Sequence, residues 1–144
     1  MMIRKANFQD LDQIYAFMCE LEACTLDFAV FQDLFRLNLQ NQHISYFVAE
    51  QGENLIGFIS LHKQYLLHHC GLVGEIQEFF VAQNSRGTGV GKLLMSAVKK
   101  NAIESKIHEI EVTTNKKRIE NVAVYQGLGF ELSHNKFTMK NFTY

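Results

Sequence analysis

Apolar residues recur at helical spacing in two early segments of the chain. The first stripe predicts a helix over residues 8–22, with Asn7 as its cap, and consists of Leu11, Ile14, Phe17, Met18 and Leu21. The second predicts a helix over residues 28–40 and consists of Phe28, Phe31, Leu34, Phe35 and Leu39. A short strand over residues 2–6 precedes both.

From residue 44 onward the pattern is typical of strands. Residues 44–51 and 55–67 predict a hairpin that turns through Gly52-Glu53-Asn54. Later elements are a strand over 73–81, a helix from about Val90, a strand over 107–114, a helix over 118–127 and a closing hairpin of 129–133 with 136–142. This order predicts an α+β fold, with a mixed sheet flanked by helices.

The composition narrows the class of protein. A length of 144 residues fits one domain over residues 1–144, and 47% hydrophobic with 20% charged residues is ordinary for a globular protein. The net charge of −1 argues against nucleic acid or a membrane surface as a partner. The beginning of the chain lacks an apolar signal core, and three unpaired cysteines fit a reducing cytoplasm.

A glycine-rich loop follows the strand over 73–81. It reads Arg86-Gly87-Thr88-Gly89-Val90-Gly91-Lys92 and leads directly into the next helix. Alternate glycines leave backbone N–H groups unobstructed, and the helix N-terminus adds a positive dipole end. Arg86 and Lys92 add charge, so the loop predicts a seat for a pyrophosphate. A Rossmann loop requires G-x-G-x-x-G, and a Walker loop requires Gly-Lys-Ser/Thr; the sequence supplies neither.

The loop resembles the central motif of the GNAT acetyltransferase superfamily, Arg/Gln-x-x-Gly-x-Gly/Ala, through Arg86, Gly89 and Gly91. A second family signature, Tyr-x-x-x-Gly-Phe, is matched by Tyr125, Gly129 and Phe130. The resemblance implies the GNAT fold: a mostly antiparallel sheet with a bulged fourth strand, and acetyl-CoA as cosubstrate. The Asn and Ala often found before the Tyr are Arg118 and Asn121 here, so Asn115 or Asn121 takes over the contacts of that Asn.

Further segments resemble the bacterial aminoalkylphosphonate N-acetyltransferases over about residues 3–140. They include Gly74-Glu75-Ile76-Gln77-Glu78 and Thr114-Asn115-Lys116-Lys117-Arg118. This resemblance implies an aminoalkylphosphonate as acetyl acceptor and an activity helped by a divalent cation. The alternatives are another amine (a polyamine, an aminoglycoside or a peptide N-terminus) or a CoA-binding sensor without catalysis. Some relatives pair as homodimers, so the helix near 28–40 covers either a dimer interface or the acceptor cleft.

The family reaction is a direct attack of the amine on the thioester within a ternary complex. The resemblance assigns the oxyanion donor to the backbone N–H of Phe79 or Phe80, and the acid for the thiolate to Tyr125. The residues expected to bind acetyl-CoA are Phe79, Phe80, Val81, Arg86, Gly87, Thr88, Gly89, Val90, Gly91, Lys92, Asn115, Asn121 and Tyr125.

An ammonium group has a pKa of roughly 10, so the reaction also needs a base. Glu75 and Glu78 are the candidates, although strict alternation puts them on opposite faces of the strand. Glu75 with His62 and His68 forms a candidate set for a metal ion or for the acceptor's acidic group, and Arg118 is a further candidate for that group.

Overall fold

The computed structural model describes residues 1–142, and these fall into two compact units. The first covers Met1–Val112 and the second begins at Thr113. Whether the chain acts as a single domain stays a prediction. The elements of the first unit are β1 (Met2–Lys5), η1 (Phe8–Asp10), α1 (Leu11–Glu22), α2 (Phe28–Leu39), β2 (Ile44–Gln51), β3 (Asn54–Leu66), η2 (Leu67–His69), β4 (Gly71–Val81), η3 (Gln83–Ser85), α3 (Val90–Glu104) and β5 (Ile110–Val112).

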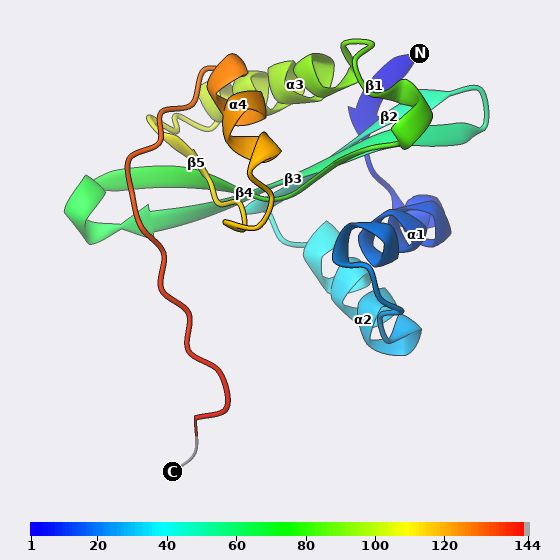
Figure 1. The fold of residues 1–144 in the computed structure, drawn as a ribbon, viewed down its shortest axis with the longest axis horizontal. Helices are drawn as coiled ribbons and strands as arrows, with labels where there is room; N and C mark the ends of the chain where they lie inside the picture. The colour runs from blue at the N-terminus through cyan, green and yellow to red at the C-terminus, as the bar shows by residue number, and fades with distance from the viewer. Residues whose placement is uncertain (143–144) are drawn as a thin grey trace. The chain divides into compact units, whose positions relative to one another are not determined.

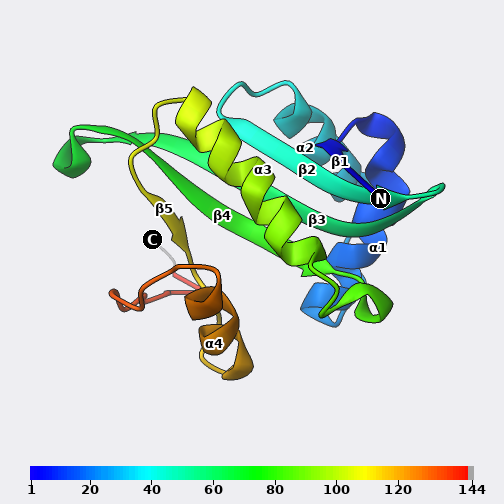
Figure 2. The same ribbon diagram turned by 90° about the horizontal axis from the view of Figure 1, so that it is seen from above.

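The first unit is a five-stranded sheet covered by helices on both faces. The strand order is β1-β2-β3-β4-β5, with antiparallel pairs except for the parallel pair of β4 and β5. Helix α3 lies over one face, and α1 with α2 lie over the other (Figures 1 and 2). The expected mixed, mostly antiparallel sheet between helices is therefore confirmed.

Two apolar layers hold the helices against the sheet. On the α1 and α2 face, a buried cluster joins both helices to β2, β3 and β4; it consists of Leu11, Ile14, Met18, Phe35, Val48, Leu55, Phe58 and Phe80. On the opposite face α3 comes so close to β3 that a Cβ at Gly57 would stand 2.8 Å from Leu94 Cδ1. Only glycine permits that approach.

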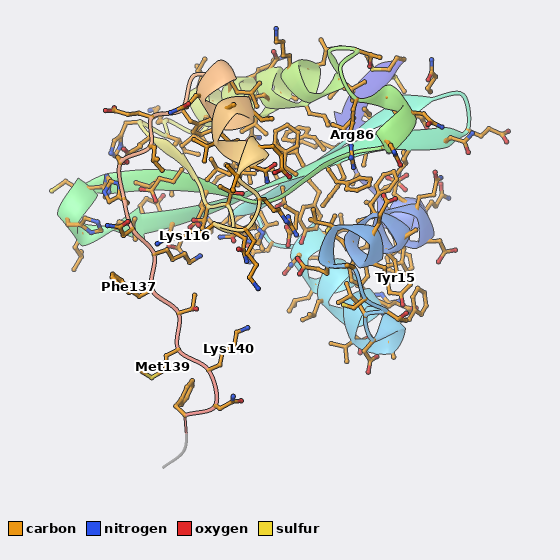
Figure 3. The ribbon with its side chains drawn as sticks, viewed as in Figure 1. Tyr15, Arg86, Lys116, Phe137, Met139 and Lys140 are labelled. Atoms are coloured by element: carbon orange, nitrogen blue, oxygen red, sulfur yellow. The ribbon has the colours of Figure 1, made fainter. Side chains whose placement is uncertain are left out.

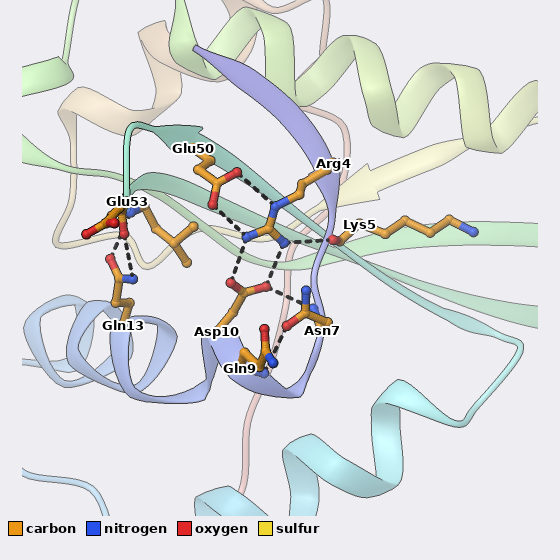
Figure 4. A network of polar contacts seen from close by, with 9 residues as sticks. Arg4, Lys5, Asn7, Gln9, Asp10, Gln13, Glu50 and Glu53 are labelled. Carbon is orange, nitrogen blue, oxygen red and sulfur yellow. Dashed lines mark hydrogen bonds and ion pairs between the residues drawn. The ribbon is translucent and has the colours of Figure 1, made fainter.

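A charged network fixes the start of α1 against the sheet. The Asp10 carboxylate accepts hydrogen bonds of 2.8 Å from both Nη atoms of Arg4 and from the Asn7 backbone N–H (Figure 4). Glu50 on β2 accepts two more from the same guanidinium, at 3.1 and 3.2 Å. The Asn7 side chain in turn caps the following turn through Gln9 N. The predicted cap is confirmed, although the first turn is 3-10 rather than α-helical.

The other predicted elements of the first unit are present with small shifts of their ends. The hairpin of β2 and β3 turns at Gly52, whose φ is +64°. Helix α3 runs from Val90 to Glu104. The strand expected over 107–114 is reduced to the three residues of β5, which pair only with Gly74, Glu75 and Ile76.

The second unit holds one helix, α4 (Glu120–Gly127), within the described residues. The closing hairpin predicted for 129–133 and 136–142 is wrong, because residues 129–142 form no strand. Leu132, Phe137 and Met139 are 71%, 93% and 79% exposed along this extended segment (Figure 3). A two-stranded hairpin is marginal in water without a third strand or a covering helix, so alternating apolar residues alone do not form it.

Candidate functional site

The glycine loop has the backbone that its sequence predicts. Gly87 and Gly89 have φ of +76° and +94°, in the left-handed region that favours glycine. Gly89 is the N-cap of α3, and Gly87, Thr88 and Gly89 are all exposed. The first N–H groups of a helix have no partner within the helix, so the loop presents donors and a positive dipole end to solvent.

Arg86 anchors the loop to the end of β4 (Figure 3). Its Nε donates a 2.9 Å hydrogen bond to the Val81 carbonyl, and its guanidinium lies 5.7 Å from the centroid of the Phe80 ring. The side chain is exposed, so its terminal nitrogens lie at the loop surface beside the N-terminus of α3. This arrangement suits an anion with several oxygens, such as a pyrophosphate.

A β-bulge interrupts β4 just before the loop. Ile59 on β3 pairs with Phe79, whereas Leu61 pairs with Ile76, so β4 has one residue more than β3 across this stretch. Ser60 therefore faces the two residues Gln77 and Glu78. The expected bulged fourth strand is confirmed.

The bulge brings both candidate carboxylates to one face of the sheet. His62 pairs with Glu75, which puts these two side chains on the face of Ser60. The Ser60 hydroxyl, on that same face, donates a hydrogen bond to Glu78 Oε1. Simple alternation separates residues 75 and 78, but the extra residue shifts the count by one. Glu75, Glu78 and His62 thus share the face on which α1 and α2 lie.

Polar groups from two further elements border the carboxylates. Tyr46 on β2 pairs with Ser60 and accepts a 2.7 Å hydrogen bond from Asn38 of α2. Burial raises the pKa of Tyr46, the bond from Asn38 opposes this, and the charge of Glu78 raises it further. His62 lies with its ring centroid 6.4 Å from that of Tyr46, and its Nε2 is buried without a hydrogen-bond partner among the described residues. A phenol and an imidazole therefore lie on the same face as the two carboxylates.

The backbone of β4 separates the two candidates for the oxyanion donor. The N–H groups of Glu78 and Ala82 point toward β3, where they bond to Ser60 Oγ and to the Ile56 carbonyl, each at 2.9 Å. Alternation directs the Phe80 N–H to the same side and the Phe79 N–H to the opposite side. That opposite side is the edge along which β5 stops pairing after Ile76. Phe80 itself is 4% exposed, and its ring stacks on Phe17 at 4.7 Å, as expected for a core residue.

The second unit contains the remaining predicted residues. Burial raises the pKa of Tyr125, with a smaller opposing effect of the Arg118 charge, so the hydroxyl stays protonated at neutral pH. Its ring meets Phe130 edge-on at 5.9 Å. Both candidate asparagines bond locally: Asn115 Oδ1 accepts from the Lys117 N–H, and Asn121 Nδ2 donates to Thr114 Oγ1, each at 2.9 Å.

The candidate metal set of His62, His68 and Glu75 does not come together. His62 lies in register with Glu75, but His68 lies in the turn between β3 and β4, beyond the end of the strand that carries His62. Among the described residues, the group with metal-binding geometry is His69, Glu109 and Glu111. The His69 ring nitrogens lie 3.2 Å from Glu109 and 3.9 Å from Glu111, an ion-pair arrangement that ties the turn to β5.

Sequence reasoning missed Ser60, which bonds to Glu78, and Tyr46, whose pKa the Glu78 charge raises. It also missed Asn38, which bonds to Tyr46. One signal was available: Ser60 interrupts the apolar run Phe58-Ile59-Ser60-Leu61, and a hydroxyl buried in such a run requires a partner. Within residues 1–142, none of the helices has both the length and the apolar character that crossing a membrane would require.

Comparisons with known proteins identify similar sequences. The model of the acetyltransferase (GNAT) family matches residues 8–130. An aminoalkylphosphonate N-acetyltransferase from Salmonella typhimurium is 36% identical over 136 residues, which are 94% of this chain and 88% of that protein.

Solved structures share the fold at lower identity. A transcriptional regulator from Bacillus halodurans superposes with a TM-score of 0.89 at 24% identity, covering 97% of this chain and 99% of its own. AAC(6')-Iy, in complex with a bisubstrate analogue of CoA, gives 0.86 at 23% identity, covering 99% and 98%.

Proposed function

Because this chain belongs to the GNAT acetyltransferase family, and is thus an acetyl-CoA-dependent N-acetyltransferase acting on amines, we propose that its acceptor is an aminoalkylphosphonate. The Salmonella relative supports this acceptor, since it carries that name and matches 94% of the chain. The observation that carries the acetyl-transfer chemistry is the bulge of β4, which gives Glu75 and Glu78, the candidate bases, one common face beside His62.

In the proposed reaction Glu78 or Glu75 takes a proton from the acceptor's ammonium group, directly or through a water. The free amine then attacks the thioester carbonyl and a C–N bond forms. As the C–S bond breaks, the nitrogen gives its second proton to water, which leaves a neutral amide. The Phe79 N–H donates to the oxyanion of the tetrahedral intermediate, because alternation directs it toward the open edge of β4. Tyr125 gives its proton to the departing CoA thiolate; burial raises the pKa of its hydroxyl, so the proton is in place at neutral pH before that step. The solvent later returns a proton to Tyr125.

Acetyl-CoA is bound in this proposal by the loop before α3. The backbone N–H groups from Gly87 to Gly91, which begin with three exposed residues, hold the pyrophosphate together with Arg86 and Lys92. Phe79, Phe80 and Val81 border the pantetheine through the backbone of β4. Asn115 and Asn121 form local hydrogen bonds, so any cofactor contact from them adds to those bonds or replaces them.

The acceptor's phosphonate requires cations or hydrogen-bond donors. His62 suits this role, since its Nε2 has no hydrogen-bond partner among the described residues and protonation would give it a positive charge. Arg118 is the second candidate, as a side chain able to bind two oxygens at once. No step is assigned to a metal ion, because His62, His68 and Glu75 do not assemble into a site.

A coupled assay of CoA release tests the acceptor. The panel contains aminomethylphosphonate, 2-aminoethylphosphonate, a polyamine and an aminoglycoside, each with EDTA and with added divalent ion. Highest kcat/KM for the phosphonates is the expected result. Turnover restricted to the polyamine or the aminoglycoside would refute the proposed acceptor, and tight acetyl-CoA binding without turnover of any amine would indicate a sensor.

The homodimer expected from the sequence stays a prediction. Sedimentation velocity at several concentrations decides it, with a single species of 16.6 kDa as the contrary outcome.

A further inference from the structure

Ser60 is a hydroxyl buried within an apolar strand. It is 0% exposed, as are its neighbours Ile59 and Leu61. A buried hydroxyl without partners destabilises a fold by about 1–3 kcal/mol, so its contacts account for its presence there. Both of its hydrogen bonds within the described residues go to one residue, Glu78.

The two bonds close a ring across the bulge. The Ser60 hydroxyl donates to Glu78 Oε1 and accepts from the Glu78 backbone N–H at 2.9 Å. The proton and one of the two lone pairs of the hydroxyl are thereby used, and the two bonds are mutually consistent. In a regular ladder the Glu78 N–H would bond to a backbone carbonyl of the neighbouring strand. At the bulge it bonds to the Ser60 hydroxyl instead.

This ring restricts Glu78 in two ways. Its backbone is held where the extra residue of β4 turns its side chain to the face of Glu75 and His62. Its carboxylate is held through Oε1, which leaves Oε2 as the oxygen that can accept a further proton. An unrestrained glutamate has three rotatable side-chain bonds, so a fixed carboxylate keeps its proton-accepting oxygen in one direction.

We propose that Ser60 is a positioning residue for acetyl transfer, which acts by holding Glu78 as the base that accepts the ammonium proton at Oε2. The inference rests on the proposed function and narrows its open choice between two carboxylates. Glu78 is chosen because a buried hydroxyl from the adjacent strand fixes it; Glu75 lies in register with His62 on that strand.

Other groups on this face have to be considered in a pH experiment. Tyr46 comes from β2, His62 from β3 and Glu75 from β4. Helix α2 contributes the neutral Asn38, and α1 contributes Phe17, which stacks on Phe80. Because these ionisable side chains share the face with Glu78, variants of Glu78 are needed to assign any pH effect to it.

The test measures kcat against pH for the wild type, Ser60→Ala, Glu78→Gln and the double variant, with 2-aminoethylphosphonate as acceptor. A positioned base accelerates a reaction by about 10²- to 10⁴-fold, and Ser60→Ala removes only the positioning. We therefore expect this variant to lower kcat roughly tenfold. The acid limb of its profile moves to higher pH, because a hydrogen bond to the ionised carboxylate has been lost. The Kd of acetyl-CoA, measured by calorimetry, stays within about twofold of the wild-type value, because Ser60→Ala leaves the loop before α3 unchanged.

The double variant separates positioning from general damage. If Ser60 acts through Glu78, Ser60→Ala lowers kcat no further in the Glu78→Gln background. An equal drop in both backgrounds, or an unmoved acid limb, overturns the inference. Ser96→Ala is the matched control, because its exposed hydroxyl bonds only to the Lys92 carbonyl within α3, at 2.9 Å. Should Ser60→Ala fail to fold, Ser60→Cys keeps the shape with a weaker donor and is interpreted in the same way.

Failure of the proposed function gives a different result. A wild type without turnover of any amine refutes that function before Ser60 is considered. A wild type that turns over, with Glu78→Gln unimpaired, refutes the base assignment and with it the role of Ser60. An impaired Glu78→Gln beside an unimpaired Ser60→Ala refutes the role of Ser60 alone.

Discussion

Gly89 provides a quantitative test of the loop from Arg86 to Lys92 as the proposed binding site of acetyl-CoA. Its φ of +94° lies in a region that an L residue avoids, while a Cβ there would meet no atom within 4 Å. Gly89→Ala therefore changes backbone strain without adding a clash. Gly91 is the matched control, because it lacks a positive φ and its Cβ would make an ordinary 3.5 Å contact with Phe79 Cζ.

The left-handed conformation is about 1–2 kcal/mol less favourable for alanine than the right-handed one. This strain has two places to appear. If alanine keeps the conformation in the free protein, the free energy of unfolding falls by that amount. If the free loop relaxes instead, acetyl-CoA must restore the conformation, and its Kd rises by about 5- to 30-fold, since 1.4 kcal/mol is tenfold. The two losses together are expected to be about 1–2 kcal/mol.

Both quantities are measurable on the same preparations. Urea unfolding followed by far-UV circular dichroism gives the free energy of unfolding, and titration calorimetry gives the Kd of acetyl-CoA. Gly91→Ala is expected neither to lower the free energy of unfolding nor to raise the Kd of acetyl-CoA, because alanine is the better helix former. A Gly89→Ala protein with wild-type stability and wild-type Kd refutes the reasoning, as does an equal loss in Gly91→Ala.

Two further predictions concern the rest of the molecule. Asp10→Asn is expected to lower the free energy of unfolding by about 2 kcal/mol, because it removes a charge-assisted partner of Arg4. Burial raises the pKa of Asp10, but the bonds from Arg4 and the Asn7 N–H, with the charge of Arg4, lower it overall. The loss in urea unfolding should therefore be complete above pH of about 4 and vanish as the pH falls through the lowered pKa; a loss independent of pH contradicts this. Tyr125→Phe is expected to reduce kcat only roughly tenfold, because a thiolate is already a fair leaving group, and to leave the Kd of acetyl-CoA unchanged. If rapid-quench kinetics show the same rate of the chemical step in this variant as in the wild type, Tyr125 has no part in the mechanism.

Periodicity located most of the fold, and α1 buries its stripe as expected, whereas α2 buries Phe35 but leaves Phe28 39% and Leu34 53% exposed. The apolar spacing of α1 places Leu11, Ile14 and Met18 in one buried cluster, as a helix must. The same kind of pattern failed for residues 129–142, where alternation occurs without a partner strand. Alternation shows which residues would share a face. It does not show that a neighbouring strand is available to bond with them.

The candidate site was predictable where its residues are contiguous. The loop from Arg86 to Lys92 carries its own conformational requirement, because glycine at positive φ is a local property. Pairings between strands are not local. His68 has the same parity as His62, yet β3 ends at Leu66 and His68 belongs to the turn. Ser60 meets Glu78 only because of a register that no single strand encodes.

One inserted residue relates both halves of the proposed reaction. Without the bulge, Glu75 and Glu78 would lie on opposite faces of β4, and one of them would point toward α3 and away from His62. With the bulge, Glu78 lies on the same face as Glu75. The next backbone N–H, that of Phe79, points away from β3, toward the edge of β4 where pairing with β5 has ended. The proposed base and the proposed oxyanion donor are thus one residue apart. The base suits an amine that approaches from the face of α1 and α2, and the donor suits a thioester that lies along the edge of β4. In the proposed reaction that geometry fits direct attack in a ternary complex, since it supplies a proton acceptor for the amine beside the donor for the thioester oxygen.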